Sequence, residues 1–250
     1  MTPLPGAEPD PRRGLRASLA TPETKRRYVR RLFSTIADRY DLITRFLSYG
    51  QDRRWKRRLT TLAGVGPGTQ ALDLACGTGD IAYALQAGGA VTTALDITPR
   101  MLDLAAAKQP SGPRPHWIAG DMMALPFASG QFDVVTTGYG IRNVPVIQGA
   151  LEEIHRVLKP GGLFLSLDFN RPSNLAVRAV YLTYLTVVGS SLGFVLHGDP
   201  DTYRYIPESI KRYPGAVAVC GLLRERGFSR CEYLPVLGGL MAIHRGVKAG

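Results

Sequence analysis

The sequence predicts an α/β protein in which helices cover both faces of a mostly parallel β-sheet. Short apolar runs alternate with segments of helical periodicity, and short turns join them, which is the pattern of repeated βαβ units. The chain has 250 residues, of which 45% are hydrophobic and 20% charged. A chain of this length and composition can bury the core of one large domain with additions.

The N-terminal part is expected to lie outside this sheet. Residues 1–24 are rich in Pro, Gly and Arg and lack the apolar core of a signal peptide, so we expect a disordered basic tail. Residues 25–63 are expected to form a helical cap, because apolar residues such as Leu32 and Ile36 fall on one helical face. A turn-rich break then leads into the main domain, residues 64–250.

The main domain is predicted to contain seven strands. The first five alternate with helices, and a helix at 215–228 precedes two antiparallel strands within 231–246. The first five strands are expected at 70–77, 90–98, 114–121, 132–140 and 163–169, with a "KPGG" turn before the fifth, and the helices at 81–86, 101–108 and 146–158.

An uncharged stretch interrupts this alternation. Residues 179–196, "AVYLTYLTVVGSSLGFVL", lie within an expected insertion of about 172–212 and are long enough to raise the question of a transmembrane helix. A bilayer crossing would separate the last two strands from the sheet that they complete. A plain core helix is one alternative. We expect a helical lid that lines an apolar substrate cavity or touches a membrane. Its shared helical face is expected to carry Val177, Val180, Tyr181, Tyr184, Leu185 and Val188.

Positive charge is concentrated in the N-terminal fifth of the chain. Of the net +11, residues 1–58 supply 15 Lys and Arg against 6 Asp and Glu. This basic block fits a solvated helix face or an anionic membrane surface. Nucleic acid is not expected as a partner, because no RNA-binding platform or DNA-reading motif accompanies the charge.

Cysteines and histidines predict neither a disulfide framework nor a metal site. The three cysteines form no C-x-x-C pair, which is typical of a reducing, cytoplasmic compartment, and the four histidines lack metal-ligand spacing. These residues are Cys76, Cys220, Cys231, His116, His155, His197 and His244.

The stretch "ALDLACGTGD", residues 71–80, ends an apolar run in a glycine-rich turn. Its continuation to Ala82 fits the G-x-G-x-x-G/A pattern of dinucleotide-binding oxidoreductases. The carboxylates of Asp73 and Asp80 would repel a pyrophosphate at this helix N-terminus but attract the sulfonium and ammonium groups of S-adenosylmethionine. The loop therefore favours S-adenosylmethionine over NAD.

Two further carboxylates follow the next strands. Asp96 ends the second predicted strand, where a carboxylate accepts ribose hydroxyls in either type of site. Asp121 ends the third, where it could accept the exocyclic amine of adenine while Met122 packs on the ring. A cap or turn role is the alternative for a lone Asp at such a position.

Five motifs occur in the order found in class I S-adenosylmethionine-dependent methyltransferases: "LDLACGTGD", "LDIT..ML", "GDMMALPF", "FDVVTTGYGIRNV" and "HRVLKPGG". Four further stretches, "FSTIADRYDLITRFLSYGQDRRWKR", "GYGIRNV", "DTYRYIPESI" and "MAIHRG", resemble the menaquinone and ubiquinone biosynthesis C-methyltransferases. The resemblance runs from about Arg31 to the C-terminus. It implies a Rossmann-like class I methyltransferase fold with a seven-stranded sheet, an N-terminal helical extension and a helical lid insertion.

The same resemblance implies which residues form the site. Gly138 departs from the family, which often has Ser or Thr there, so that side-chain contact is absent. The expected cofactor-binding residues are Asp73, Gly77, Thr78, Gly79, Asp96, Ile97, Met101, Asp121, Met122 and Gly138.

Four residues are expected to act on the acceptor. Arg142 and Asn143 follow the fourth strand, and Arg142 could stabilise a developing phenolate, with a surface salt bridge as the alternative. Tyr40 and Asp41 could close over the cofactor and orient the acceptor hydroxyl, with helix packing and a turn as the alternative. No metal is needed for this chemistry.

The implied reaction transfers a methyl group to a ring carbon of a prenylated quinol. Demethylmenaquinol is the favoured acceptor, and a ubiquinone precursor or another lipid or small molecule is the alternative. Such a substrate implies a cytoplasmic enzyme in peripheral contact with an anionic membrane. The sequence leaves open the ring type, the tail length, the general base and whether the chain forms a homodimer.

Overall fold

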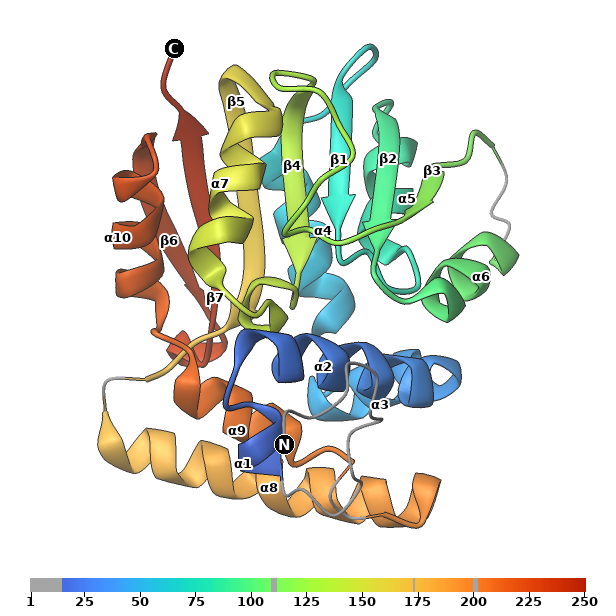
Figure 1. The fold of residues 1–250 in the computed structure, drawn as a ribbon, viewed down its shortest axis with the longest axis vertical. Coiled ribbons are helices and arrows are strands. Elements are labelled where there is room, and N and C mark those ends of the chain that lie inside the picture. The colour runs from blue at the N-terminus through green and yellow to red at the C-terminus, as the bar shows by residue number, and fades with distance from the viewer. Residues whose placement is uncertain (1–14, 109–111, 173, 200–201) are drawn as a thin grey trace, which may run out of the picture.

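The computed structural model describes residues 15–108, 112–172, 174–199 and 202–250 (Figure 1). Seven strands form one sheet in the order β3-β2-β1-β4-β5-β7-β6. Strands β1 to β5 are parallel, β7 is antiparallel to β5, and β6 is antiparallel to β7. The expected fold class is confirmed. The strands are β1 Gln70–Leu74, β2 Val91–Asp96, β3 His116–Ala119, β4 Phe132–Gly138, β5 Leu158–Phe169, β6 Phe228–Val236 and β7 Met241–Lys248.

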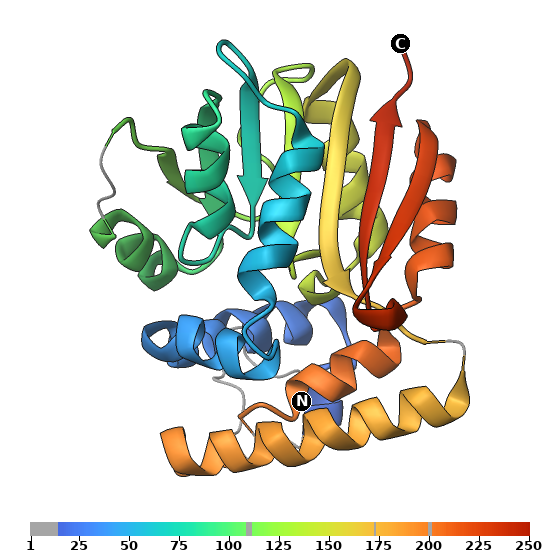
Figure 2. The same ribbon diagram turned by 180° about the vertical axis from the view of Figure 1, so that it is seen from behind.

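Helices cover both faces of the sheet because its central strands are apolar on both sides. One core lies between the sheet and the helices α7, Ile147–Val157, and α10, Ala216–Glu225. The second core lies under α4, Asp52–Ala63, and α5, Asp80–Ala87. Figures 1 and 2 show these two helix pairs on opposite faces. A further helix, α6 (Pro99–Ala107), packs beside β2 and β3.

The N-terminal region differs from the expected disordered tail over residues 15–24. A short helix, α1 (Leu15–Ser18), precedes α2, Pro22–Ile36. Thr21 caps α2 by accepting a hydrogen bond from the Thr24 amide, and the side chain of Leu19 is buried. The first 14 residues of the expected tail lie outside the described residues.

The helical cap expected over residues 25–63 is present, but it is divided into three helices. A 3-10 turn, Ala37–Arg39, separates α2 from α3, Tyr40–Leu47. Positive φ angles of 52° at Tyr49 and 73° at Gly50 then end α3 before α4 begins. The chain therefore folds back from α3 onto the sheet.

The "KPGG" stretch also differs from expectation, because β5 begins at Leu158 and includes it. The register of β5 against β4 shifts between Phe132 and Val134, and Gly161 has a φ of 76°. A glycine in this conformation allows the irregularity inside the strand.

The expected insertion contains α8, Leu175–His197, and α9, Tyr205–Arg212. In both views α2 and α3 lie against the end of the sheet to which β1, β2 and β4 point, and α8 lies beyond them, far from the C-terminus (Figures 1 and 2). The face expected to be shared along α8 is only partly packed: Tyr181 and Leu185 are buried, but Val177 and Val180 are exposed. The helix is apolar all round, so periodicity could not identify its packed face.

Candidate functional site

Three adjoining hollows lie where the parallel strands end, because the carboxyl ends of such strands meet at one edge of the sheet. The strand-end hollow, about 710 Å³, lies among the loops after β1, β2, β3 and β4. The cap hollow, about 760 Å³, lies among α2, α3, α8 and α9. The glycine-loop hollow, about 290 Å³, lies beside the turn after β1. Tyr40 and Tyr139 line all three.

Seven of the ten expected cofactor-binding residues line the strand-end hollow. Asp96 holds the glycine loop, since its carboxylate accepts hydrogen bonds from the Gly77 amide at 2.9 Å and the Thr98 amide at 2.8 Å. Burial raises the pKa of Asp96, although these amide hydrogen bonds oppose the shift. The seven are Gly77, Asp96, Ile97, Met101, Asp121, Met122 and Gly138.

Asp121 forms the kind of turn hydrogen bond that was considered as the alternative to cofactor binding. It also has a second partner, which the sequence did not predict. Its Oδ1 accepts a hydrogen bond from the Met123 amide at 2.9 Å, and its Oδ2 lies 2.9 Å from Nε of Arg26 on α2. Arg26 also lines the strand-end hollow. The N-terminal cap therefore closes over this hollow.

The glycine loop requires positive φ angles, which are 54° at Gly77 and 85° at Gly79. A Cβ atom on Gly79 would lie 2.7 Å from the ring of Trp117, so this glycine permits helix packing and lines none of the three hollows. A Cβ on Gly138 would lie 2.7 Å from Cδ1 of Ile81, so a larger residue here would require the end of that side chain to shift. Ala75 and Tyr139 adopt φ angles of 49° and 61°, and such strained positions concentrate at functional sites.

Asp73 is fully buried at the end of β1 and lines the glycine-loop hollow. Its Oδ1 accepts a hydrogen bond from Thr136 at 2.8 Å, while its Oδ2 makes no hydrogen bond within the described residues. Burial raises the pKa of Asp73 to about 7, even though the Thr136 hydrogen bond lowers it. A buried carboxylate of this kind would be stabilised by a cationic ligand in the hollow.

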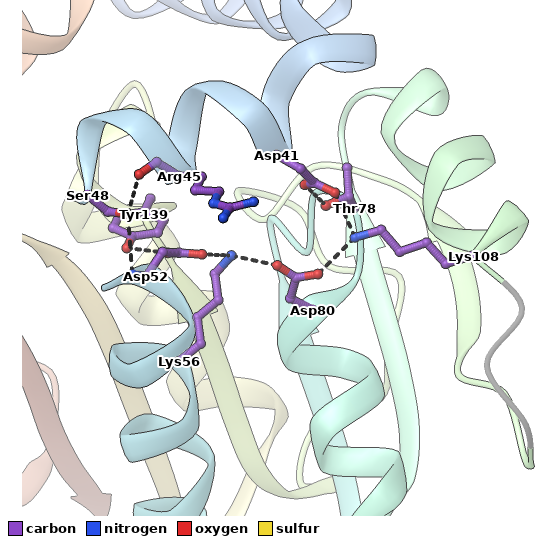
Figure 3. A network of polar contacts seen from close by, with 9 residues as sticks. All are labelled: Asp41, Arg45, Ser48, Asp52, Lys56, Thr78, Asp80, Lys108 and Tyr139. Carbon is purple, nitrogen blue, oxygen red and sulfur yellow. Dashed lines mark hydrogen bonds and ion pairs between the residues drawn. The ribbon is translucent and has the colours of Figure 1, made fainter. Parts of the chain in front are cut away.

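A chain of polar contacts surrounds the glycine loop (Figure 3). Tyr139 donates to Oδ1 of Asp52 at 2.6 Å, and Lys56 lies 2.7 Å from Asp52 and 2.9 Å from Asp80. Burial lowers the pKa of Lys56, but Asp52 and Asp80 outweigh it and raise the pKa above its ordinary value. Sequence reasoning did not single out Asp52 or Lys56, whose i,i+4 spacing on a helix was the available signal.

The same chain of contacts continues to Asp41. Lys108 lies 2.8 Å from Asp80 and 3.0 Å from Asp41, and Thr78 donates to Asp41 at 2.5 Å. Asp41 thus holds α3 to the glycine loop, and it lines none of the three hollows. Its expected action on an acceptor hydroxyl has no geometric support, whereas its neighbour Tyr40 lies where the hollows meet.

Arg142 is only 6% exposed, so the alternative reading as a surface salt bridge is wrong. Its Nε lies 3.1 Å from Oδ1 of Asp168. Its Nη1 donates to Ser209 at 2.7 Å and to Oδ1 of Asn143 at 3.1 Å. Its guanidinium carbon lies 4.8 Å from the ring centre of Phe169. These contacts orient a buried cation in the wall of the cap hollow.

Asn143 connects the two larger hollows. It lines the strand-end hollow, donates to the Tyr139 carbonyl at 2.7 Å, and accepts a hydrogen bond from Tyr205 of the cap hollow at 2.9 Å. Sequence reasoning missed Asp168, which ends β5 at the same sheet edge as the other carboxylates. Its position after a strand was the available signal.

The cap hollow is lined mainly by apolar and aromatic side chains. They come from elements far apart in the sequence, which explains why no local motif predicted the hollow. Representative members are Phe33, Ile43, Leu47, Phe169, Tyr181 and Ile206.

The family model and the sequence relatives of this chain indicate the same protein family. A family model described as "ubiE/COQ5 methyltransferase family" matches residues 21–248. The chain is 40% identical over 237 residues to "Ubiquinone/menaquinone biosynthesis C-methyltransferase UbiE" of Methylobacterium nodulans, with 90% of this chain and 92% of that protein covered. It is 41% identical over 218 residues to "Demethylmenaquinone methyltransferase" of Thermus thermophilus, with 86% and 99% covered.

Solved structures share the fold at low sequence identity. A protein of Thermotoga maritima described as "SAM-dependent methyltransferase, possible histamine N-methyltransferase" superposes with a TM-score of 0.63 at 17% identity, covering 88% of this chain and 99% of that chain. This likeness establishes the class I methyltransferase fold and nothing about the acceptor.

Proposed function

The chain belongs to the ubiE/COQ5 methyltransferase family, and we infer from this membership that it methylates a ring carbon of a prenylated quinol with S-adenosylmethionine. One structural observation supports this proposal at the level of individual residues. The strand-end hollow, with its carboxylates, and the apolar cap hollow, with Arg142 in its wall, meet at Tyr40 and Tyr139. A methyl donor in the first hollow would therefore face an acceptor ring in the second.

The residues around the strand-end and glycine-loop hollows fit the cofactor. Asp96 and Asp121 would hold the ribose and the adenine, with Ile97, Met101 and Met122 as the apolar walls. The unpaired oxygen of Asp73 fits the cationic methionine end, and Lys56, which lines the same small hollow, would attract its carboxylate. When bound, S-adenosylmethionine supplies a methyl group that is already activated on its sulfonium.

The acceptor is proposed to lie in the cap hollow with its quinol hydroxyl near Arg142. Loss of the hydroxyl proton makes the adjacent ring carbon nucleophilic, and the buried guanidinium stabilises the phenolate that develops. Arg142 lines the cap hollow, so its guanidinium is placed to face a ring that binds there. The ring carbon gains the methyl group and loses its own proton as aromaticity returns.

Tyr40 and Tyr139 are proposed to position the ring rather than to remove its proton. Burial raises the pKa of Tyr40 to about 12, although the nearby Lys56 opposes the shift. Burial also raises the pKa of Tyr139 well above its ordinary value, and Asp52 raises it further. Neither phenol is a base near neutral pH. Their place at the junction instead keeps water from the reacting carbon.

We propose demethylmenaquinol as the acceptor, in keeping with the name of the Thermus thermophilus relative. The Methylobacterium nodulans relative carries a name that covers both quinones, so the corresponding ubiquinone precursor is the alternative.

The proposed reaction can be tested by incubating the protein with methyl-labelled S-adenosylmethionine and reduced demethylmenaquinone in detergent. A demethylated ubiquinone precursor is supplied in a parallel reaction. Label in the naphthoquinol product supports the proposal, and label in the benzoquinol product selects the alternative. Cofactor binding with transfer to neither lipid would contradict the proposed acceptor.

We also propose that the protein makes peripheral contact with an anionic membrane. Exposed arginines on α2 and α4 support this, because a polybasic surface is attracted to acidic lipids. The alternative is that the exposed surface forms a homodimer interface. Measurements of vesicle binding and of molecular size distinguish the two.

A further inference from the structure

The outer face of α8 is apolar, uncharged and open to solvent. Val180, Val187 and Phe194, spaced seven residues apart, are 72%, 60% and 66% exposed, and Val195 is 76% exposed. No Asp, Glu, Lys or Arg occupies an exposed position of this helix. We call this surface the outer α8 face and define it by these four side chains. Large exposed apolar side chains gathered on one uncharged helix face are typical of an interaction site in a folded protein.

The opposite face of α8 is packed against the body of the protein. Tyr181, Leu185, Gly189 and Gly193 recur every four residues and are buried. A Cβ atom on Gly189 would lie 3.2 Å from Cβ of Tyr203, so the two segments approach closely. The helix is long and apolar enough to span a membrane by length and composition alone. Its packed face argues instead for a helix that lies on a surface.

The orientation of α8 fits such a surface. In both ribbon views it runs across the end of the molecule, roughly perpendicular to the strands, at the end opposite the C-terminus (Figures 1 and 2). A planar boundary could therefore contact the whole length of α8 while the sheet stands away from it.

The cap hollow lies behind this helix and reaches the protein surface along its flank. Tyr181 of the packed face lines the hollow. Tyr49, which also lines it, is 60% exposed and stacks on Tyr184 of α8 with ring centres 5.1 Å apart. Leu237 is a further lining residue and is 37% exposed. Tyrosines at such an opening suit the interface between lipid and water.

The charges beside α8 also favour lipid. Arg178 is the only Asp, Glu, Lys or Arg in the helix, and it is half-buried near the N-terminal end. At the other end, burial lowers the pKa of His197, Arg39 lowers it further and Asp199 opposes both, so the imidazole is neutral near pH 7. An apolar face with arginines close to its ends complements acidic headgroups above acyl chains.

We propose that the outer α8 face inserts into the surface layer of a lipid bilayer, so that the cap hollow opens toward the acyl region and admits the prenylated acceptor from the membrane. This inference rests on the proposed function for the identity of the lipid-like substrate. The bilayer surface itself is inferred from the exposure, charge and orientation of α8.

The test is co-sedimentation of the full chain with phosphatidylcholine/phosphatidylglycerol vesicles. The Val187→Glu/Phe194→Glu variant is expected to bind at least tenfold more weakly, because it places two charges in the apolar layer. Val217→Glu is the matched control, since Val217 is a 71% exposed valine on α10. Equal binding by the double variant and the wild type would overturn the proposal. So would a dimer, seen by light scattering, that the double variant abolishes while vesicle binding persists.

A second variant keeps the apolar face intact. Val187→Trp should show fluorescence quenching by lipids brominated on their acyl chains beyond that of the wild type, and absence of this extra quenching would contradict insertion. Methyl transfer separates the two proposals: the double variant should retain activity on a detergent-solubilised quinol and lose it on the same quinol in vesicles. If the wild type methylates neither while binding still depends on the outer α8 face, the acceptor proposal fails and the surface proposal stands.

Discussion

At the scale of single residues, the candidate site is a set of buried charges with specified partners. Arg142 faces Asp168 and Lys56 faces Asp52, whereas among the buried carboxylates of the described chain Asp73 alone has an oxygen without a hydrogen bond. Paired charges keep their ionised form when buried, whereas an unpaired carboxylate tends to remain protonated. Burial also raises the pKa values of Asp96 and Asp168, but both oxygens of each accept hydrogen bonds, which favour the ionised form and which one oxygen of Asp73 lacks.

The stability of the protein is expected to respond to pH through Asp73. Its folded pKa of about 7 lies above the ordinary value of 3.8, so ionisation of this carboxyl disfavours the folded state as pH rises through that interval. Asp73→Asn mimics the protonated form. The free energy of unfolding of this variant, measured with urea, should exceed that of the wild type only slightly at pH 4. The difference should grow until about pH 7 and reach a few kcal/mol. The same variant should bind cofactor more weakly, since the carboxylate is lost.

Substitution of Asp133, an acid whose pKa is lowered rather than raised, is expected to have the opposite effect on stability. Burial favours the neutral form of Asp133, but Lys159 and the Gln70 amide outweigh it and hold the pKa below the ordinary value. Asp133→Asn should therefore destabilise the protein at neutral pH and lose that effect in acid. An Asp73→Asn gain that is independent of pH would contradict the assigned pKa.

Arg142 is expected to act on the reaction more than on cofactor affinity. Arg142→Lys keeps a cation opposite Asp168 but loses the planar, multidentate guanidinium. We expect kcat to fall by about 10- to 100-fold while the dissociation constant of S-adenosylhomocysteine changes by less than about threefold. Arg156→Lys is the control, because Arg156 also pairs with a carboxylate, that of Glu153 on α7, but in a more exposed position that lines none of the three hollows. Equal losses in kcat and in cofactor binding would argue for a merely structural role.

At the scale of secondary-structure elements, the cap is held to the sheet by side chains from several helices. Lys56 joins α4 to the start of α5 through Asp80, and Lys25 of α2 donates to the carbonyls of Arg142 at 3.1 Å and Val144 at 2.6 Å. Burial, together with the nearby Arg142, lowers the pKa of Lys25 to about 8. Helix spacing predicted these elements, but not which side chains would join them.

Removal of Lys56 should weaken the junction between cap and sheet. Lys56→Met leaves the buried Asp52 without its cation, which is expected to lower the free energy of unfolding by about 3 kcal/mol or more. The melting temperature would then fall by roughly 6 to 12 °C for a chain of this size. Thermal unfolding followed by circular dichroism measures the change.

Two further variants show whether a loss of stability in Lys56→Met comes from the unpaired charge of Asp52. Arg245→Met removes an exposed pair with Glu232 and should change stability by less than about 1 kcal/mol. Lys56→Met combined with Asp52→Asn should recover part of the loss, because the unpaired charge is gone. If Lys56→Met were no worse than Arg245→Met, the network would not stabilise the cap.

At the scale of the whole molecule, two distant segments converge on one edge of the sheet. Residues 15–47 approach from the N-terminus and α8 and α9 approach from the insertion, and together they enclose the cap hollow (Figure 1). Leu32, which lies in the basic region of the sequence, packs in one cluster with Tyr203 and Tyr205. Deletion of this region would therefore damage the cap, and its charge is better tested by neutralisation.

Vesicle binding is expected to depend on salt and on exposed arginines of α4. Arg53→Gln/Arg54→Gln removes two exposed cations and should weaken binding to vesicles with 30% phosphatidylglycerol by about fivefold per charge at low salt. The difference should shrink as ionic strength screens the attraction. Arg114→Gln/Arg230→Gln is the matched control, since both side chains are exposed near the starts of β3 and β6. Identical salt curves for the two double variants would contradict a directed electrostatic contact.

The sequence by itself determined the fold class, the order of the strands along the chain and the positions of Asp96, Asp121 and the glycine loop. These follow from local periodicity and from turn chemistry, which act over a few residues. Only the tertiary structure decided that Arg142 faces Asp168 and that Tyr40 lies where the hollows meet. It also decided which face of α8 is packed, because that helix is apolar all round and its orientation depends on contacts with segments far away in the chain.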